Sequence, residues 1–402
     1  MKKNAGQDRN RSTNWRSATQ LVRGGTARTG MDETAEAIFM TSGFAYDAAE
    51  IAAARFEGTD DGYTYSRLAN PTVRMFEERM ALIEGAEDAI ATASGMAAMT
   101  AALMCQLKAG DHVVAARALF GSCRWLVDNL LPKFGVETTC IDGRDTQAWA
   151  AATRENTKVF FLETPANPTL DVIDLKAVGE VAKAYDVRLV VDNVFATPIL
   201  QKPMEMGADI VAYSATKHID GQGRALGGIV LGTRDFIREE LLPFTRNTGP
   251  TMSPFNAWIM LKGLETLDLR VRKMSENARE VADWLAPRVP RLLYPGRSDH
   301  PQHELAMRQM EAGGSIMSFF LDGGRYQAFS LMNSCALIDI SNNIGDSKSL
   351  ITHPASTTHW GLGEEGREEL GISEGMLRLS VGLEDPADLI DDLASALHAA
   401  GL

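Results

Sequence analysis

A lysine and an aspartate each follow an apolar run of the kind that forms buried β-strands. The run Arg188–Val191 ends in Asp192, and the run Asp209–Tyr213 leads within four residues to Lys217. Ligands of parallel sheets bind beyond the carboxyl ends of the strands, so we expect both side chains to face one crevice. A buried lysine amine loses its proton readily and attacks carbonyls, and a carboxylate can keep a ring nitrogen protonated. Together the two residues predict a pyridoxal phosphate site.

A phosphate site is the third part that such chemistry needs, and the sequence offers two candidates. The segment Ser94-Gly95-Met96 directly precedes the helical run 97–104, and the N–H groups of a helix N-terminus bind anions. Ser214 and Thr216 add hydroxyl groups just before Lys217. Alone, each feature is commoner as an ordinary helix cap or a solvated turn residue. Their combination with the lysine and the aspartate favours the cofactor site.

Strands and helices alternate through the part of the chain that carries these residues. A helical pattern begins at Thr72 and stops at Gly85, and further helical patterns lie between the apolar runs. This alternation, with near-continuous apolar runs, predicts an α/β fold whose mostly parallel sheet is covered by helices on both faces. The strand-like runs are 112–115, 136–141, 159–162, 187–191, 210–213 and 228–231.

Differences in periodicity and residue pattern along the sequence suggest three parts. Residues 1–60 show weak periodicity and are expected to form an N-terminal arm, whose basic start resembles an ordinary mobile terminus more than an interaction arm. Residues 61–260 carry the alternating pattern and form the predicted cofactor-binding domain. A long amphipathic helix around 264–286 introduces residues 261–402, a smaller C-terminal α+β domain with Gly-rich turns and a final helix.

Composition excludes several classes of protein. The 402 residues are 45% hydrophobic and 23% charged, as in ordinary globular domains, and the net charge of −13 argues against nucleic acid as a partner. The four cysteines are far apart and form no C-x-x-C pair, which favours a reducing cytoplasm over a disulfide framework or a zinc site. No signal peptide or membrane-spanning run is recognisable. His300 and His303 flank Pro301 and are expected in a loop, so no metal site is predicted.

Five motifs in order resemble the Cys/Met-metabolism family of pyridoxal phosphate enzymes. Two C-terminal segments, His353–Ser356 and Arg378–Glu384, extend the resemblance almost to the end of the chain. The resemblance implies a fold-type I architecture of the aspartate aminotransferase kind. The five motifs are Tyr65–Thr72, the segment that starts at Ser94-Gly95-Met96, Glu163–Pro168, Asp192–Pro198 and Ser214–Lys217.

The resemblance also implies roles for individual residues. Lys217 would hold the cofactor covalently and move protons, and Asp192 would keep the ring nitrogen protonated. The phosphate would be bound by Gly95, Met96, Ser214 and Thr216, with Ser94 at the same helix start.

Further roles concern the substrate and a second subunit. Arg378, helped by Asn167 and the backbone around Ser341, would bind the substrate α-carboxylate, because its planar fork matches two oxygens. Tyr65 and Arg67 would reach the phosphate in a neighbouring subunit. The resemblance therefore implies a homo-oligomer, expected to be a tetramer built from dimers that share active sites.

One residue departs from the pattern of the family. Where most members have a tyrosine followed by glycine, this chain has Phe120 and Gly121. Phe120 can stack on the cofactor but has no hydroxyl to exchange protons, so proton transfer would depend more on Lys217. This argues against a broad-purpose γ-lyase.

Together with the segment Asn343–Pro354 and the tail around Arg378, Phe120 makes the chain most similar to the branch of the family that acts on O-succinyl-L-homoserine. The implied reaction is replacement of the succinyloxy group by sulfide, which gives L-homocysteine and succinate in methionine biosynthesis. Arg117, close before Phe120, is a candidate for binding the distal carboxylate of the substrate.

Other readings stay open. Within the family they are cystathionine γ-synthase, O-acetylhomoserine sulfhydrylase and methionine γ-lyase. A non-catalytic relative that keeps the cofactor would retain the fold, although the presence of Lys217, Asp192 and Arg378 argues against it. Tyr213 and Lys217 also have the spacing of the short-chain dehydrogenase pair, but the glycine fingerprint of that class is missing.

Overall fold

The computed structural model describes residues 14–402, and the basic start of the chain, residues 1–13, lies outside them. The described chain divides into two compact units, each made of several segments. The first contains residues up to 106, 212–216 and 224–266, and the second contains 107–211, 217–223 and 267–402. Each unit combines segments from separate parts of the chain, so the units cannot be compared directly with the three continuous ranges predicted from the sequence. Those ranges stay a prediction.

The first unit contains the candidate phosphate residues and an antiparallel pair of strands. Strand β1 (Asp88–Thr92) pairs with β7 (Gly228–Gly232). Helix α4 (Pro71–Glu84) begins where the Asn70 side chain accepts from the N–H groups of Thr72 and Val73, and ends at Gly85 with a φ of 84°. The other elements are α2 (Ser17–Arg23), α3 (Ala49–Glu57), α5 (Gly95–Met104), the π-helix η3 (Phe236–Leu241), α11 (Leu242–Thr248) and α12 (Pro254–Leu264).

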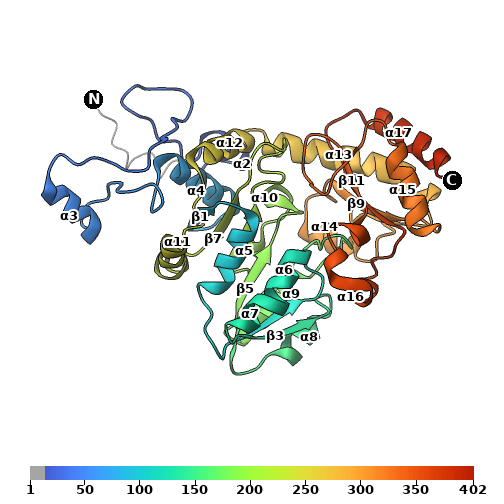
Figure 1. The fold of residues 1–402 in the computed structure, drawn as a ribbon, viewed down its shortest axis with the longest axis horizontal. Helices are drawn as coiled ribbons and strands as arrows, with labels where there is room; N and C mark the ends of the chain where they lie inside the picture. Colours follow the sequence, from blue (N-terminus) through green and yellow to red (C-terminus); the bar gives the residue numbers. More distant parts are fainter. Residues whose placement is uncertain (1–13) are drawn as a thin grey trace. The chain divides into compact units, whose positions relative to one another are not determined.

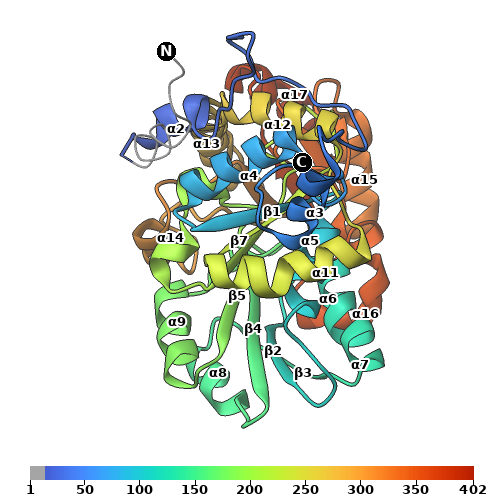
Figure 2. The ribbon, with the colours of Figure 1, turned by 90° about the vertical axis from the view of Figure 1, so that its left-hand side faces the viewer.

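The second unit contains the parallel strands that the apolar runs predict. Strands β2 (His112–Ala116), β3 (Glu137–Ile141), β4 (Thr157–Glu163) and β5 (Arg188–Asp192) pair in parallel, in the order β3-β2-β4-β5. Figure 2 shows α8 and α9 on one side of these strands and α6 and α7 on the other. The elements between the strands are α6 (Gly121–Trp125), η1 (Leu126–Leu130), α7 (Leu131–Lys133), α8 (Thr146–Ala152), α9 (Leu175–Ala184), α10 (Thr197–Leu200) and η2 (Pro203–Met206).

Strand β6 (Ile210–Ser214) completes a sheet with the strand order β1-β7-β6-β5-β4-β2-β3. Its central strands are buried on both faces, as expected for a parallel sheet covered by helices. The predicted α/β fold with a mostly parallel sheet is therefore confirmed. Strand β1 was not among the predicted runs, because two of its five residues are alanines and carry little strand signal.

The second unit also contains a smaller sheet, in the order β10-β11-β12-β9-β8. Buried side chains of helices α13, α15 and α17 and of strands β9 and β12 form one hydrophobic cluster. Figure 1 shows these helices beside β9 and β11. The elements are α13 (Leu267–Leu285), η4 (Ala286–Arg288), β8 (Arg291–Leu293), α14 (His303–Gln309), β9 (Ile316–Phe320), α15 (Gly324–Ser334), β10 (Asp339–Ile340), β11 (Leu350–Thr352), η5 (Pro354–Ser356), η6 (Trp360–Leu362), α16 (Gly363–Glu369), β12 (Met376–Ser380) and α17 (Pro386–Ala399). Among residues 14–402, no helix is long and apolar enough to span a bilayer.

Candidate active site

Lys217 lies three residues after β6, and its amine is held by a side chain from a distant part of the sequence. The Nζ atom donates a hydrogen bond of 2.6 Å to Oδ1 of Asn343. Burial lowers the pKa of Lys217 to about 8, and the positive charge of Arg378 acts in the same direction. An amine with this pKa is partly unprotonated near neutral pH, as a nucleophile or a base must be.

Asp192 is the last residue of β5 and is buried. Its Oδ1 accepts a hydrogen bond of 3.1 Å from the N–H group of Val194. Burial raises the pKa of Asp192 to about 7, although this hydrogen bond lowers it. A buried carboxylate with one N–H donor keeps acceptor capacity for a further donor, and a protonated ring nitrogen supplies such a donor. Asp192 therefore fits the pyridine ring of pyridoxal phosphate.

Arg378 lies on β12 and is fully buried, with 2% of its surface exposed. Its Nη1 donates to Oδ1 of Asn167 at 2.8 Å, and its Nη2 donates to the carbonyl of Asn342 at 2.9 Å. Its Nε is buried without a hydrogen-bond partner in the described chain, and no carboxylate of residues 14–402 forms an ion pair with it. Burial lowers the pKa of Arg378 to about 10, against the opposing effect of Glu163. A buried guanidinium without an ion-pair partner fits an anionic substrate group.

The candidate phosphate residues lie in the first unit. Ser94 caps α5, and its Oγ accepts from the N–H group of Ala97 at 3.2 Å. A Cβ atom added to Gly95 would lie 2.5 Å from Cβ of Ser214, so only glycine allows the start of α5 to approach the end of β6 so closely. The first-turn N–H groups of Gly95 and Met96 and the Ser214 hydroxyl thus belong to one corner of this unit. The Thr216 hydroxyl accepts from the N–H group of Gly227 at 3.1 Å and donates to its carbonyl at 3.3 Å.

Tyr65 and Arg67 also lie in the first unit, in the segment before α4. Tyr65 is 43% exposed and forms an isolated antiparallel bridge with Gly43. The Arg67 guanidinium lies 5.5 Å from the centroid of the Tyr65 ring, and its Nη1 donates to the carbonyl of Arg246. Both side chains are therefore presented at the surface of this unit.

Two further polar residues of the second unit belong to the candidate site besides those that the sequence predicts. Glu163 ends β4 and is bonded to the backbone of both Phe120 and Asn167. It obeys the same strand-end rule that selected Asp192, so the signal was present in the run that ends at Glu163. Asn343 lies in a loop after β10, and no sequence pattern pairs it with Lys217, which is 126 residues away.

Ser341 is not among the residues that accept a hydrogen bond from Arg378. Its Oγ accepts from the N–H group of Asn343 at 3.3 Å. The loop carbonyls that contact Arg378 are those of Asn342 and Asn343. Ser341 thus supports the loop whose next two residues bind the guanidinium.

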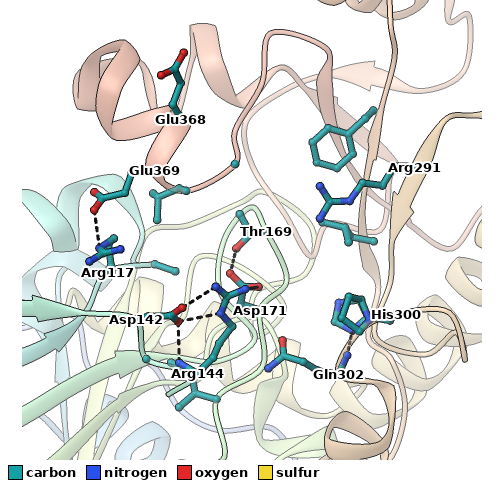
Figure 3. Close-up of a pocket in the computed structure, with 18 residues that line it drawn as sticks. Arg117, Asp142, Arg144, Thr169, Asp171, Arg291, His300, Gln302, Glu368 and Glu369 are labelled. Carbon is teal, nitrogen blue, oxygen red and sulfur yellow. Dashed lines mark hydrogen bonds and ion pairs between the residues drawn. The ribbon is translucent and has the colours of Figure 1, made fainter. Parts of the chain in front are cut away.

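A separate cavity of about 550 Å³ lies in the second unit (Figure 3). Arg117 lines it and forms an ion pair of 3.0 Å with Glu369. Arg144 lines it as well and pairs with Asp142 at 2.7 Å and with Asp171 at 3.2 Å. Apart from Arg117, none of the residues predicted to bind cofactor or substrate lines this cavity, so the structure gives no support to Arg117 as a substrate ligand.

The two histidines considered as metal ligands have other partners. Nδ1 of His300 accepts from the N–H group of Gln302 at 3.2 Å, and Nδ1 of His303 lies 2.9 Å from the carbonyl of Pro295. Within residues 14–402 no group of three or more His, Cys, Asp or Glu side chains is arranged to hold a metal ion.

Comparison with known proteins finds similarity along most of the chain. A sequence profile described as "Cys/Met metabolism PLP-dependent enzyme" matches residues 18–398. An O-succinylhomoserine sulfhydrylase of Mycobacterium tuberculosis is 50% identical over 94% of this chain and 95% of its own length. One of Pseudomonas aeruginosa is 47% identical over 95% of both chains.

A solved structure is similar over nearly the whole fold. It is a putative O-acetylhomoserine (thiol)-lyase of Campylobacter jejuni, which superposes with a TM-score of 0.92 at 31% identity. The match covers 96% of this chain and all of the other. That structure carries N'-pyridoxyl-lysine-5'-monophosphate, a lysine joined to the cofactor.

Proposed function

Because the chain belongs to the Cys/Met metabolism family of pyridoxal phosphate-dependent enzymes, we propose that it converts O-succinyl-L-homoserine and sulfide to L-homocysteine and succinate. The chain is an enzyme, and its cofactor is pyridoxal phosphate. The observation that carries the reaction class is the partly buried network that contains Lys217, Asn343 and Arg378. The choice of the succinyl ester is supported by the two sulfhydrylases that resemble the chain along most of its length.

The proposed roles follow from the contacts of each side chain. When bound, pyridoxal phosphate supplies an electron-withdrawing ring that stabilises negative charge on the substrate carbon atoms next to the amino group. Lys217 Nζ would hold the cofactor covalently and, when free of it, would accept the proton from Cα of the substrate. It would pass this proton on to the bound cofactor before accepting one from Cβ, because an ammonium group has no lone pair for a second proton. Asp192 keeps a proton on the ring nitrogen, and Arg378 binds the α-carboxylate. Succinate leaves from Cγ, hydrosulfide bonds to the same carbon, and Nζ returns the protons.

Asn343 is proposed to hold the Lys217 amine between these steps. Its Oδ1 accepts from Nζ at 2.6 Å, and its carbonyl lies 3.4 Å from Nη2 of Arg378. One loop residue thus connects the proton-transferring amine with the carboxylate-binding guanidinium. Phe120 has no hydroxyl, so the amine is the group in this set that can move the substrate protons.

The remaining assignments rest on position. Residues 61–260 are proposed to form the cofactor-binding domain, with Ser94-Gly95-Met96, Ser214 and Thr216 on the phosphate, and residues 261–402 the C-terminal domain. The four free cysteines support a cytoplasmic location, where thiols stay reduced.

A homo-oligomer is proposed from the N-terminal part of the first unit. Helix α3 contains six apolar residues, yet none of its residues is buried, and Phe56 is 72% exposed. A helix of this composition is expected to be covered by another surface. Tyr65 and Arg67 follow this helix and are proposed to reach the phosphate in the neighbouring subunit.

Shared active sites predict complementation between two inactive variants. Lys217→Ala and Arg67→Ala proteins are each expected to have little activity, because each lacks one half of every site. Mixing them with subunit exchange should restore activity in about a quarter of the sites, since half of randomly formed dimers contain one intact site. Sulfhydrylase activity after mixing, with sedimentation to count subunits, measures this. No recovery despite proven exchange would place Tyr65 and Arg67 in the site of their own subunit.

The substrate proposal is tested by the products of the purified enzyme. O-succinylhomoserine and O-acetylhomoserine are each offered with sulfide or with cysteine. We expect the highest kcat/KM for the succinyl ester with sulfide, with homocysteine and succinate formed in equal amounts. Cystathionine as the main product would make the enzyme a cystathionine γ-synthase. Release of 2-oxobutanoate without a sulfur acceptor would make it a γ-lyase.

A further inference from the structure

Glu163 is a buried carboxylate whose two oxygens bind two different segments of the proposed site. Its Oε2 accepts a hydrogen bond of 2.6 Å from the N–H group of Phe120. Its Oε1 accepts one of 3.0 Å from the N–H group of Asn167. The side chain is 2% exposed and ends β4, so a rigid central strand fixes its position. Each oxygen has a separate task, and an amide could perform only one of them.

The two segments carry different functions. Phe120 precedes α6 as its N-cap residue and holds the aromatic ring proposed to stack on the cofactor. Asn167 accepts from Nη1 of Arg378 through its side chain, while its backbone N–H is bonded to Glu163. Glu163 therefore fixes the backbone of the residue that carries the aromatic ring and the backbone of the residue whose side chain binds the guanidinium.

The position of Glu163 beside Asp192 gives it an electrostatic role as well. The two residues are register partners at the carboxyl ends of β4 and β5. Burial and the charge of Asp192 raise the pKa of Glu163 well above its usual range, while its N–H donors and Arg378 oppose this. Two buried carboxylates at neighbouring strand ends are coupled, because the negative charge of one disfavours ionisation of the other. A change in charge at Glu163 is therefore felt by the group that faces the ring nitrogen.

We propose that Glu163 is a positioning residue that sets both the tilt of the cofactor, through Phe120, and the orientation of Arg378, through Asn167. This inference rests on the proposed roles of Phe120 and Arg378. The Glu163 carboxylate would thus help to align the reacting carbon with Lys217 Nζ, because this alignment requires that both the cofactor and the substrate carboxylate are held in place.

The test uses Glu163→Gln, which keeps the size of the side chain but places an NH₂ group against one of the two N–H donors. We expect a fall of about 10- to 100-fold in kcat/KM. The KM for the ester should rise because Arg378 is displaced, and the visible circular dichroism of the bound cofactor should change because Phe120 is displaced. Glu163→Asp keeps the acid but shortens its reach, and it should change the same quantities in the same direction.

A matched control is available in the C-terminal helix α17. Asp392 is also a buried carboxylate that accepts backbone N–H bonds, from Ala336 at 2.6 Å and from Leu337 and Ile338 at 3.1 and 3.0 Å. Asp392→Asn should lower the unfolding temperature but leave the KM and the cofactor dichroism unchanged. If both Glu163 variants behave like this control, Glu163 serves stability alone and the proposal is wrong.

The dichroism separates this proposal from the assignment of the substrate. The spectrum reports the bound cofactor and needs no turnover. If the wild-type enzyme made no homocysteine but the Glu163 variants changed the cofactor dichroism, the substrate assignment would fail and the positioning of the cofactor would stand. If the wild-type enzyme made homocysteine but the Glu163 variants left the cofactor dichroism unchanged, the substrate assignment would stand and the positioning of the cofactor by Glu163 would fail.

Discussion

Replacement of Lys217 by alanine is expected to lower kcat for homocysteine formation by at least about 10⁴-fold, because the variant loses both the covalent hold on the cofactor and the proton-transferring amine. The amine is placed for both tasks by burial and by its 2.6 Å hydrogen bond to Asn343. The cofactor should still bind, since Asp192 and the proposed phosphate residues are unchanged, but it should be removable by dialysis. Turnover with saturating cofactor and the retention of cofactor after dialysis measure the two losses separately.

The control for this variant is Lys158→Ala. Lys158 is an exposed residue near the amino end of β4, far along the strand from the site end. It should keep wild-type turnover and wild-type cofactor retention. If Lys217→Ala retained more than about one hundredth of the wild-type kcat, another base would have to move the substrate protons.

Replacement of Arg378 by alanine is expected to raise the KM for the ester and to lower kcat/KM by roughly 10²- to 10³-fold, the cost of removing one partner from a buried charge pair. Lysine at this position should recover only part of the loss, because an ammonium group cannot replace the planar fork that donates to Asn167 and Asn342 together. The measurement is the steady-state kinetics of the three proteins.

A substrate analogue identifies the cause of that loss. The α-carboxamide of the ester has no negative charge for Arg378 to bind. Wild-type enzyme should prefer the carboxylate strongly, whereas Arg378→Ala should treat the acid and the amide nearly alike. An undiminished preference for the carboxylate in the variant would mean that another cation binds this group.

The sequence predicts the fold well where one physical rule decides the outcome. Strands β2, β4 and β5 are buried on both faces, so their sequences are almost continuous runs of apolar residues that can be recognised without a structure. Strand β1 has a weaker signal, and its place beside β7 depends on a pairing between residues about 140 positions apart. The division into compact units could not be predicted either, because its segments are brought together from separate parts of the chain.

The same distinction applies to the site. Lys217 and Asp192 were predicted because the ends of parallel strands point into a common crevice. Glu163 obeys that rule too, but its function depends on which N–H groups its oxygens meet, and this is fixed only by the folded loops. Asn343 was missed because it comes from a loop after the short strand β10. Local patterns thus identify the residues on the sheet, while partners from loops need the structure.

The exact partners of Arg378 show the limit of motif reasoning most clearly. The expected helpers were Asn167 and the backbone near Ser341, and the structure gives Asn167 together with the carbonyls of Asn342 and Asn343. A shift of one or two residues in a loop has no signature in composition or periodicity. Because Arg378 binds the backbone carbonyl of Asn343, the side-chain amide of Asn343 can accept the hydrogen bond from Lys217.

The most direct test of the account is to find where the cofactor is attached. The purified holoenzyme is reduced with borohydride, which makes the linkage between lysine and cofactor permanent, and is then digested and analysed by mass spectrometry. The account predicts one phosphopyridoxyl group per chain, on the peptide that contains Lys217, and none in the Lys217→Ala protein. A phosphopyridoxyl group on a different lysine, or a yellow holoenzyme that yields no modified lysine, would contradict it.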